Sequence, residues 1–179
     1  MYKYCATEES AQRQRQLEQC LQQLMLFTDY RQITISQICE QAGISRKSFY
    51  RYFGSKDDCL QALIDHAVFD GASFYMGDKR VDMVLCERFF YYWKEQAPLL
   101  DALVRNGLTV LLTERMSLYI IQEEQDLGTY LNSWIDGVCR EHILFYSAGV
   151  MSLVLEWHHS GYKKSILQMS KILADLVGR

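Results

Sequence analysis

The chain has 179 residues, 49% of them hydrophobic and 13% aromatic, which suffices for the core of one or two domains and is too apolar for a disordered protein. Its formal net charge is −3, so a surface that is basic throughout is excluded. The six cysteines include no CxxC spacing, and charges interrupt every apolar run before membrane-spanning length, so we expect a cytoplasmic protein with reduced, mostly buried thiols.

The N-terminal third is predicted to form helices joined by short connectors. Apolar spacing predicts a first helix over about 7–28. Thr34 opens a capping-box pattern and begins a second helix, which ends at Gly43 because glycine readily adopts the left-handed conformation of a helix terminus. Ser45 is a favourable N-cap for a third helix, and a fourth follows over 55–76.

Beyond residue 80 the sequence consists of long segments with helical apolar spacing. No strand-like alternation interrupts them, and the single proline, Pro98, suits the first turn of a helix. The predicted helices are 80–96, 98–106, 108–125, 134–160 and 164–177. We therefore expect an all-α protein of about nine helices, with a small head (residues 1–54) and a larger body (residues 55–179) that helix 55–76 connects.

The stretch 34–56 reverses the charge sign of the chain. Residues 1–60 hold eight Lys and Arg against seven Asp and Glu, whereas the remainder holds eleven against fifteen. No acid lies between Gln41 and Lys56, and a local cationic face on an acidic chain predicts a polyanionic partner. Its four cations are Arg46, Lys47, Arg51 and Lys56.

Two helices joined by a glycine turn suit a helix-turn-helix, whose second helix enters the major groove of DNA. Cys39 supplies the small residue at the helix contact, and Ile38, Ile44 and Phe49 supply apolar plugs. A basic helix alone is more often a solvated surface, but the turn, the plugs and the acid-free face together favour DNA binding. The predicted DNA contacts are Arg46, Lys47, Ser48, Tyr50, Arg51, Tyr52 and, at a phosphate, Lys56.

The run GISRKSFYRYFGSK, from Gly43 to Lys56, resembles the signature of TetR-family transcriptional regulators, and its YRYF.SK end is the most specific part. The resemblance covers about residues 10–65 and implies the same DNA contacts. It also implies an all-α regulator, more often a repressor, that a small-molecule inducer releases from DNA. Cys39 stands where the family more often has alanine.

The body is expected to pair two heads on a palindromic operator, because a single small head binds DNA weakly. Segment 141–160 is apolar around much of its circumference, and the small run Ser147-Ala148-Gly149 permits close helix approach. The last two helices also resemble the dimerisation helices of one branch of the family, so a homodimer is expected there. The predicted interface residues are Ile143, Tyr146, Val150, Val154, Trp157 and Ile172.

Aromatic residues gather in the body, beginning with the run FFYYW at 89–93. Such a stripe is more often core than ligand site, and the functional alternative is an apolar inducer pocket. The residues assigned to that pocket are Tyr92, Trp93, Met116, Tyr119, Trp134 and Phe145. No side-chain cluster identifies the inducer.

No metal, cofactor or catalytic centre is predicted. The neighbouring His158 and His159 point about 100° apart on a helix, which suits a shared metal poorly. No GxSxG, P-loop, HExxH or positioned Cys/His pair is recognised. Besides an inducible repressor, the sequence leaves open a regulator or co-activator that a partner protein controls through the body. An enzyme with a vestigial head is disfavoured by the intact cations.

Overall fold

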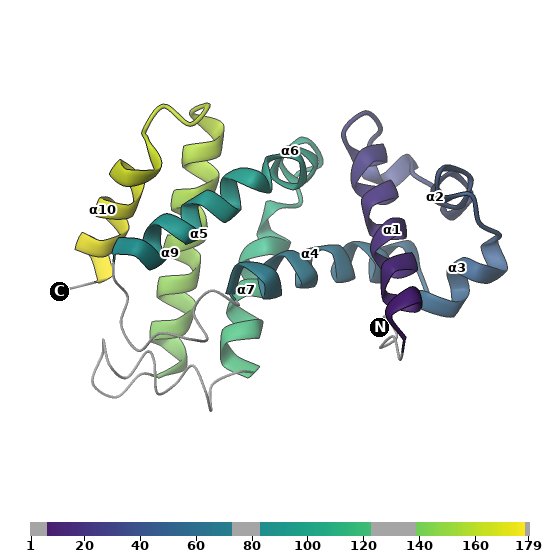
Figure 1. The fold of residues 1–179 in the computed structure, drawn as a ribbon, viewed down its shortest axis with the longest axis horizontal. Coiled ribbons are helices and arrows are strands. Elements are labelled where there is room, and N and C mark those ends of the chain that lie inside the picture. The colour runs from purple at the N-terminus through teal and green to yellow at the C-terminus, as the bar shows by residue number, and fades with distance from the viewer. Residues whose placement is uncertain (1–6, 73–82, 123–138, 178–179) are drawn as a thin grey trace. The chain divides into compact units, whose positions relative to one another are not determined.

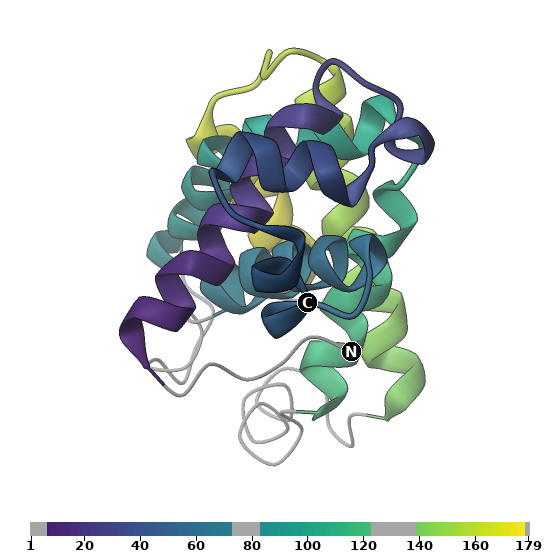
Figure 2. The same cartoon turned by 90° about the vertical axis from the view of Figure 1, so that its right-hand side faces the viewer.

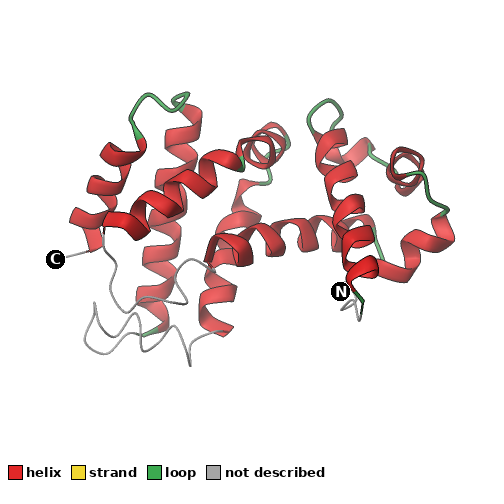
Figure 3. Cartoon of the chain, in the orientation of Figure 1, coloured by secondary structure: helices red, strands yellow, loops and turns green. Residues whose placement is uncertain are grey.

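The structure, a computed structural model, describes residues 7–72, 83–122 and 139–177. All regular structure in these ranges is helical, which confirms the all-α prediction (Figure 3). The described helices are α1 (Glu8–Met25), the 3-10 helix η1 (Tyr30–Gln32), α2 (Ile35–Ala42), α3 (Arg46–Tyr52), α4 (Lys56–Ala72), α5 (Met83–Glu95), α6 (Ala97–Arg105), α7 (Thr109–Gln122), α9 (Arg140–His159) and α10 (Ile166–Val177).

The chain divides into two compact units. Unit 1 comprises Met1–His66 and Asp101–Thr109, and unit 2 comprises Ala67–Leu100 and Val110–Arg179. Helices α4 and α6 therefore each contribute residues to both units. The predicted division between residues 54 and 55 stays a prediction.

In unit 1, α1 packs against α2 and α2 against α3 (Figure 1). The buried face of α1 centres on Leu17, Leu21 and Met25, all 0% exposed. This helix ends at Met25 rather than near residue 28, and Phe27 is 81% exposed, so the predicted helix is too long. The backbone N–H groups of residues 27 and 28 both turn back to the carbonyl of Leu24, which closes the helix.

In unit 2, α5 packs against α10 and α9. Phe90 of α5 meets Trp157 of α9 edge to face, with ring centroids 5.4 Å apart. Helices α7 and α9 lie side by side (Figures 1 and 2), where the hydroxyl oxygens of Ser117 and Ser147 are 2.6 Å apart. The aromatic run of α5 is thus mainly core.

Helix α9 begins later than the apolar pattern predicts. Cys139 is an extended N-cap residue, with φ −110° and ψ 168°, and the helix starts at Arg140. The prediction of one continuous helix over 134–160 is therefore wrong at Cys139, and residues 134–138 lie outside the described part of the chain. Apolar spacing detects a face of a helix but carries no information on the cap that ends it.

Candidate nucleic-acid interface

The helix-turn-helix consists of α2 and α3, and side-chain caps define its turn. Thr34 Oγ1 accepts a hydrogen bond from the Gln37 N–H at 3.3 Å, and Gln37 Oε1 accepts one from the Thr34 N–H at 2.8 Å. Gly43 ends α2 at φ 65° and ψ 33°, where a Cβ atom is disfavoured. Ser45 Oγ then accepts from the Ser48 N–H at 3.1 Å and begins α3.

This turn directs the apolar side of α3 inward. Phe49 and Phe53 are both 0% exposed, with ring centroids 5.5 Å apart, and Ile38 of α2 is equally buried. Each such side chain contributes about 1.5–3 kcal/mol by leaving water. Because these residues hold one side of α3 inside unit 1, only the opposite side is available to a partner.

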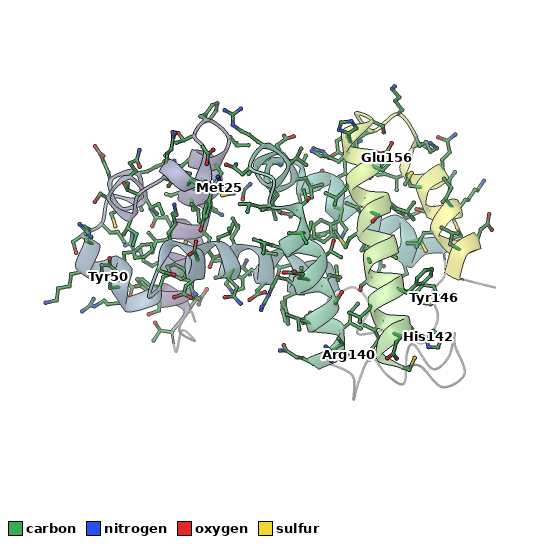
Figure 4. The ribbon with its side chains drawn as sticks, turned by 180° about the vertical axis from the view of Figure 1, so that it is seen from behind. Met25, Tyr50, Arg140, His142, Tyr146 and Glu156 are labelled. Carbon is green, nitrogen blue, oxygen red and sulfur yellow. The ribbon has the colours of Figure 1, made fainter. Side chains whose placement is uncertain are left out.

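The outer side of α3 is cationic. Its exposed residues are Arg46, Lys47, Tyr50 and Arg51, and the nitrogen-tipped side chains around Tyr50 extend outward in Figure 4. Among the described residues, none of the three cations has an ion-pair partner. Ser48 and Tyr52 are half-buried at the edges of this face. The arrangement offers charged donors to phosphates and base edges without first breaking internal ion pairs.

Lys56 differs from the other cations because its ammonium group already has partners. Nζ donates to the carbonyl oxygens of Tyr30 and Ile33, at 2.5 and 2.7 Å, and lies 4.3 Å from the centroid of the Tyr30 ring. The Tyr30 hydroxyl in turn donates to Asp57, and burial, followed by that carboxylate, raises the pKa of Tyr30 above its ordinary value. The predicted phosphate contact stays a prediction, and the structure gives Lys56 a second task, holding the α1–α2 connector against α4.

Comparison with protein families identifies this head. The family described as "Bacterial regulatory proteins, tetR family" matches residues 24–63, which include all of α2 and α3. The chain belongs to the TetR family. Its outward cationic helix is therefore that of a DNA-binding transcriptional regulator.

Solved structures extend the likeness in fold to nearly the whole chain. A TetR transcriptional regulator from Streptococcus agalactiae 2603V is 15% identical, with a TM-score of 0.64 over 94% of this chain and 95% of that one. The fatty acid degradation regulator FadR from Bacillus halodurans is also 15% identical, with a TM-score of 0.64 over 92% and 94%. The TetR family repressor AlkX from Dietzia sp. strain DQ12-45-1b is 17% identical, with a TM-score of 0.56 over 92% and 93%. A search of curated proteins found no match.

The residues predicted to bind an inducer have different environments. Trp93 and Met116 are buried, at 0 and 6% exposure, whereas Phe145 is 73% exposed. The Tyr92 hydroxyl donates to the carbonyl of Ala67 at 2.7 Å, and Tyr119 is half-buried with its ring against Phe69. Trp134 lies outside the described residues. Phe145 is thus not enclosed by its own protomer.

The residues predicted at the dimer interface also separate into two groups. Ile143, Val154 and Trp157 are 3, 1 and 3% exposed, so the core of their own protomer leaves little of these side chains for a partner. Tyr146, Val150 and Ile172 are half-buried and retain accessible surface. The apolar side chains of α9 that face solvent most are instead Leu144 and Phe145, at 42 and 73%.

Asn106 is a residue of the head that the sequence did not reveal. Its Oδ1 accepts from the Tyr30 N–H at 2.6 Å, and its Nδ2 donates to the carbonyls of Met25 and Ala102, at 3.0 and 2.7 Å. This amide ties the α1–α2 connector to the end of α6. No local pattern predicts such a bond, because two of its three partners lie more than 70 residues away.

Two further searches covered only the described residues. No cluster of three or more His, Cys, Asp or Glu side chains there could hold a metal ion. None of the helices in those ranges has both the length and the apolar character needed to cross a bilayer.

Proposed function

We propose that this TetR-family regulator is a repressor that binds a palindromic operator as a homodimer in the cytoplasm and is released by a small molecule bound in its body. The observation that carries the proposal is the outer face of α3, where exposed cations without ion-pair partners lie opposite the buried Phe49 and Phe53. The repressor role is supported by the likeness to AlkX, which is described as a repressor.

Within the head, Arg46 and Lys47 are the proposed base readers. They occupy the first turn of α3, the part of a recognition helix that meets base edges, and arginine pairs well with guanine. Tyr50, Arg51 and the half-buried Ser48 and Tyr52 are proposed to contact phosphates or thymine methyl groups, with Lys56 as a further phosphate contact. Residues 1–54 form the proposed DNA-binding domain, and residues 55–179 the regulatory domain.

The proposed homodimer pairs the exposed side of α9 with its symmetry mate. Phe145 is 73% exposed, and a Cβ atom added to Gly149, one turn further along, would have no neighbour within 4 Å. A large apolar side chain beside a small residue suits close packing of two α9 helices, and the half-buried Tyr146, Val150 and Ile172 would flank them.

The proposed inducer is an apolar molecule with one hydrogen-bond acceptor. The indole N–H of Trp93 is buried and has no hydrogen-bond partner, and a buried donor of this kind gains free energy from an acceptor. FadR is named for fatty acid degradation and AlkX is implicated in the biodegradation of n-alkanes, which supports a ligand with an aliphatic part.

The test compares two double variants that remove the same charge. Arg46→Ala/Lys47→Ala removes two cations from α3, and Lys163→Ala/Lys164→Ala removes two exposed cations from unit 2. Footprinting of the upstream DNA of the gene supplies the operator, and fluorescence anisotropy gives its affinity at several salt concentrations. We expect the α3 variant to lose specific binding, by about 100-fold or more for two base contacts of about 1–3 kcal/mol each.

The control variant should retain the affinity within a few fold, because phosphates need not approach unit 2. Equal losses in both variants would mean that net charge, rather than the face of α3, determines binding. Unchanged affinity in the α3 variant would refute the assigned reading residues.

Control by a partner protein is a second candidate function. It is favoured by the exposure of two further aromatic side chains in unit 2, Phe69 at 49% and Tyr91 at 59%. If a partner is required, the purified chain alone should bind its operator weakly, and Tyr91→Ala should abolish regulation in cells without changing that affinity.

A further inference from the structure

The first turn of α9 holds a thiol and an imidazole in contact. Cys139 Sγ lies 3.2 Å from Nδ1 of His142, and the backbone N–H of Cys139 donates to the same Nδ1 at 3.2 Å. The N–H bond identifies Nδ1 as the acceptor nitrogen of a neutral imidazole, so the ring presents a base to the thiol. Figure 4 marks His142 at this end of the helix.

The other described cysteines lack these conditions. Cys20, Cys39, Cys59 and Cys86 are buried, and burial raises the pKa of the first three thiols. Cys139 is exposed at the N-terminus of a helix of 20 residues, where the aligned peptide dipoles favour a thiolate. Nucleophilic character among the described thiols is therefore concentrated at one position.

Two charged neighbours act on this thiol in opposite senses. The Cys139 thiol forms a hydrogen bond with the Glu141 carboxylate, and this bond is the main cause of the lowered pKa of the Glu141 carboxyl. That carboxylate disfavours a thiolate, whereas the adjacent Arg140 and the helix terminus favour it. A base in direct contact, His142, removes the need for a free thiolate, because it takes the proton as the sulfur reacts.

We propose that Cys139 is a modification site at which α,β-unsaturated carbonyl compounds add to the protein, with His142 as the general base. The thiol proton moves to Nδ1 of His142 while the sulfur forms a bond to the β-carbon of the electrophile. The π electrons of the C=C bond move to the α-carbon, which then takes the proton back from the imidazolium. The product is a thioether, and no oxidant or second thiol is needed.

An adduct rather than a disulfide is the expected product. Formation of an intramolecular disulfide requires a second accessible thiol, and the other described cysteines are buried. The adduct also disturbs the cap of α9, since the hydrogen bonds of the Cys139 sulfur and N–H both end on His142. Modification stands independently of the proposed function, whereas an effect of modification on dimer formation rests on it.

The test uses N-ethylmaleimide, an α,β-unsaturated carbonyl probe, on the full-length native protein. Intact-mass spectrometry follows the number of adducts and peptide mapping locates them. We expect one fast adduct on Cys139, absent in Cys139→Ser, and a rate at pH 7 that falls by about tenfold or more in His142→Gln because the base is lost. His159→Gln, at the far end of α9, serves as the matched control and should react like the wild type.

The pH dependence keeps the proposal falsifiable even if a variant folds poorly. With His142 as the base, the wild-type rate should level off near neutral pH, the range in which imidazole titrates, instead of rising up to the ordinary thiol pKa of about 8.5. A rate that follows an ordinary thiol, a first adduct on another cysteine, or an unchanged rate in His142→Gln would each overturn it.

Discussion

Replacing Lys56 with methionine separates two roles that this residue can have in the head. Methionine keeps an unbranched apolar stem but removes the ammonium group, which donates to the carbonyls of Tyr30 and Ile33 and lies over the Tyr30 ring. Charge-assisted hydrogen bonds contribute about 1.5–3 kcal/mol each, and the ring contact about 0.5–1 kcal/mol. Because water can reach the half-buried site, we take the lower end and expect a loss of about 3 kcal/mol.

Amide hydrogen exchange can detect this loss in the head itself. All three tryptophans of the chain lie in unit 2, so tryptophan fluorescence during urea unfolding reports on that unit instead. A loss of about 3 kcal/mol corresponds to roughly 100-fold faster exchange of the most protected amides of α1 and α2, since each 1.4 kcal/mol is a factor of ten. Lys47→Met is the control, because Lys47 is exposed and has no ion-pair partner among the described residues.

Operator binding measured against salt completes the comparison. Lys47→Met should leave exchange unchanged, and a lost phosphate contact should flatten the salt dependence of binding by a slope of about 0.9. Exchange in Lys56→Met at the wild-type rate, together with the same flattening, would refute the structural role and leave Lys56 as a phosphate contact alone.

The other predictions concern single contacts. Asn106→Ala removes three hydrogen bonds from the α1–α2 connector, and urea unfolding followed by circular dichroism should give a loss of about 2–3 kcal/mol. Gly43→Ala should destabilise the protein by about 1–2 kcal/mol in the same assay, because its φ is 65°, whereas Gly149→Ala in open helical space should be neutral or slightly stabilising. Phe145→Asp should shift the protein towards monomers in analytical ultracentrifugation, and Phe27→Asp, which alters a similarly exposed phenylalanine of the head, should not; equal sedimentation of the two variants would contradict the α9 interface.

The reading head could be predicted from sequence because its determinants are local. The capping box at Thr34, the left-handed Gly43 and the cap at Ser45 each act within four residues, and the structure has all three. Apolar spacing likewise identified Phe49 as an inward residue and the cations between Arg46 and Arg51 as the opposite, solvent-facing group.

Predictions that depended on where a helix ends or what covers its face were less reliable. The thiol–imidazole pair spans only three residues, but it was missed because the apolar pattern placed Cys139 inside a helix, whereas it is the extended residue that precedes α9. In the predicted dimer set, Ile143 and Val154 have the same apolar character as Phe145, yet the first two are buried and the last is 73% exposed. Chemical type alone does not distinguish a side chain that its own protomer covers from one that is left for a partner.

The sequence by itself therefore determined the helical class, the turn, and the charge of the face that meets DNA, since caps, periodicity and charge are properties of neighbouring residues. Only the tertiary structure decided that the Lys56 ammonium binds two carbonyls of the α1–α2 connector, and that Asn106 holds the same connector from more than 70 residues away. Hydrogen bonds between distant segments depend on the packing that brings their backbones within about 3 Å, and no pattern in the local sequence encodes that distance.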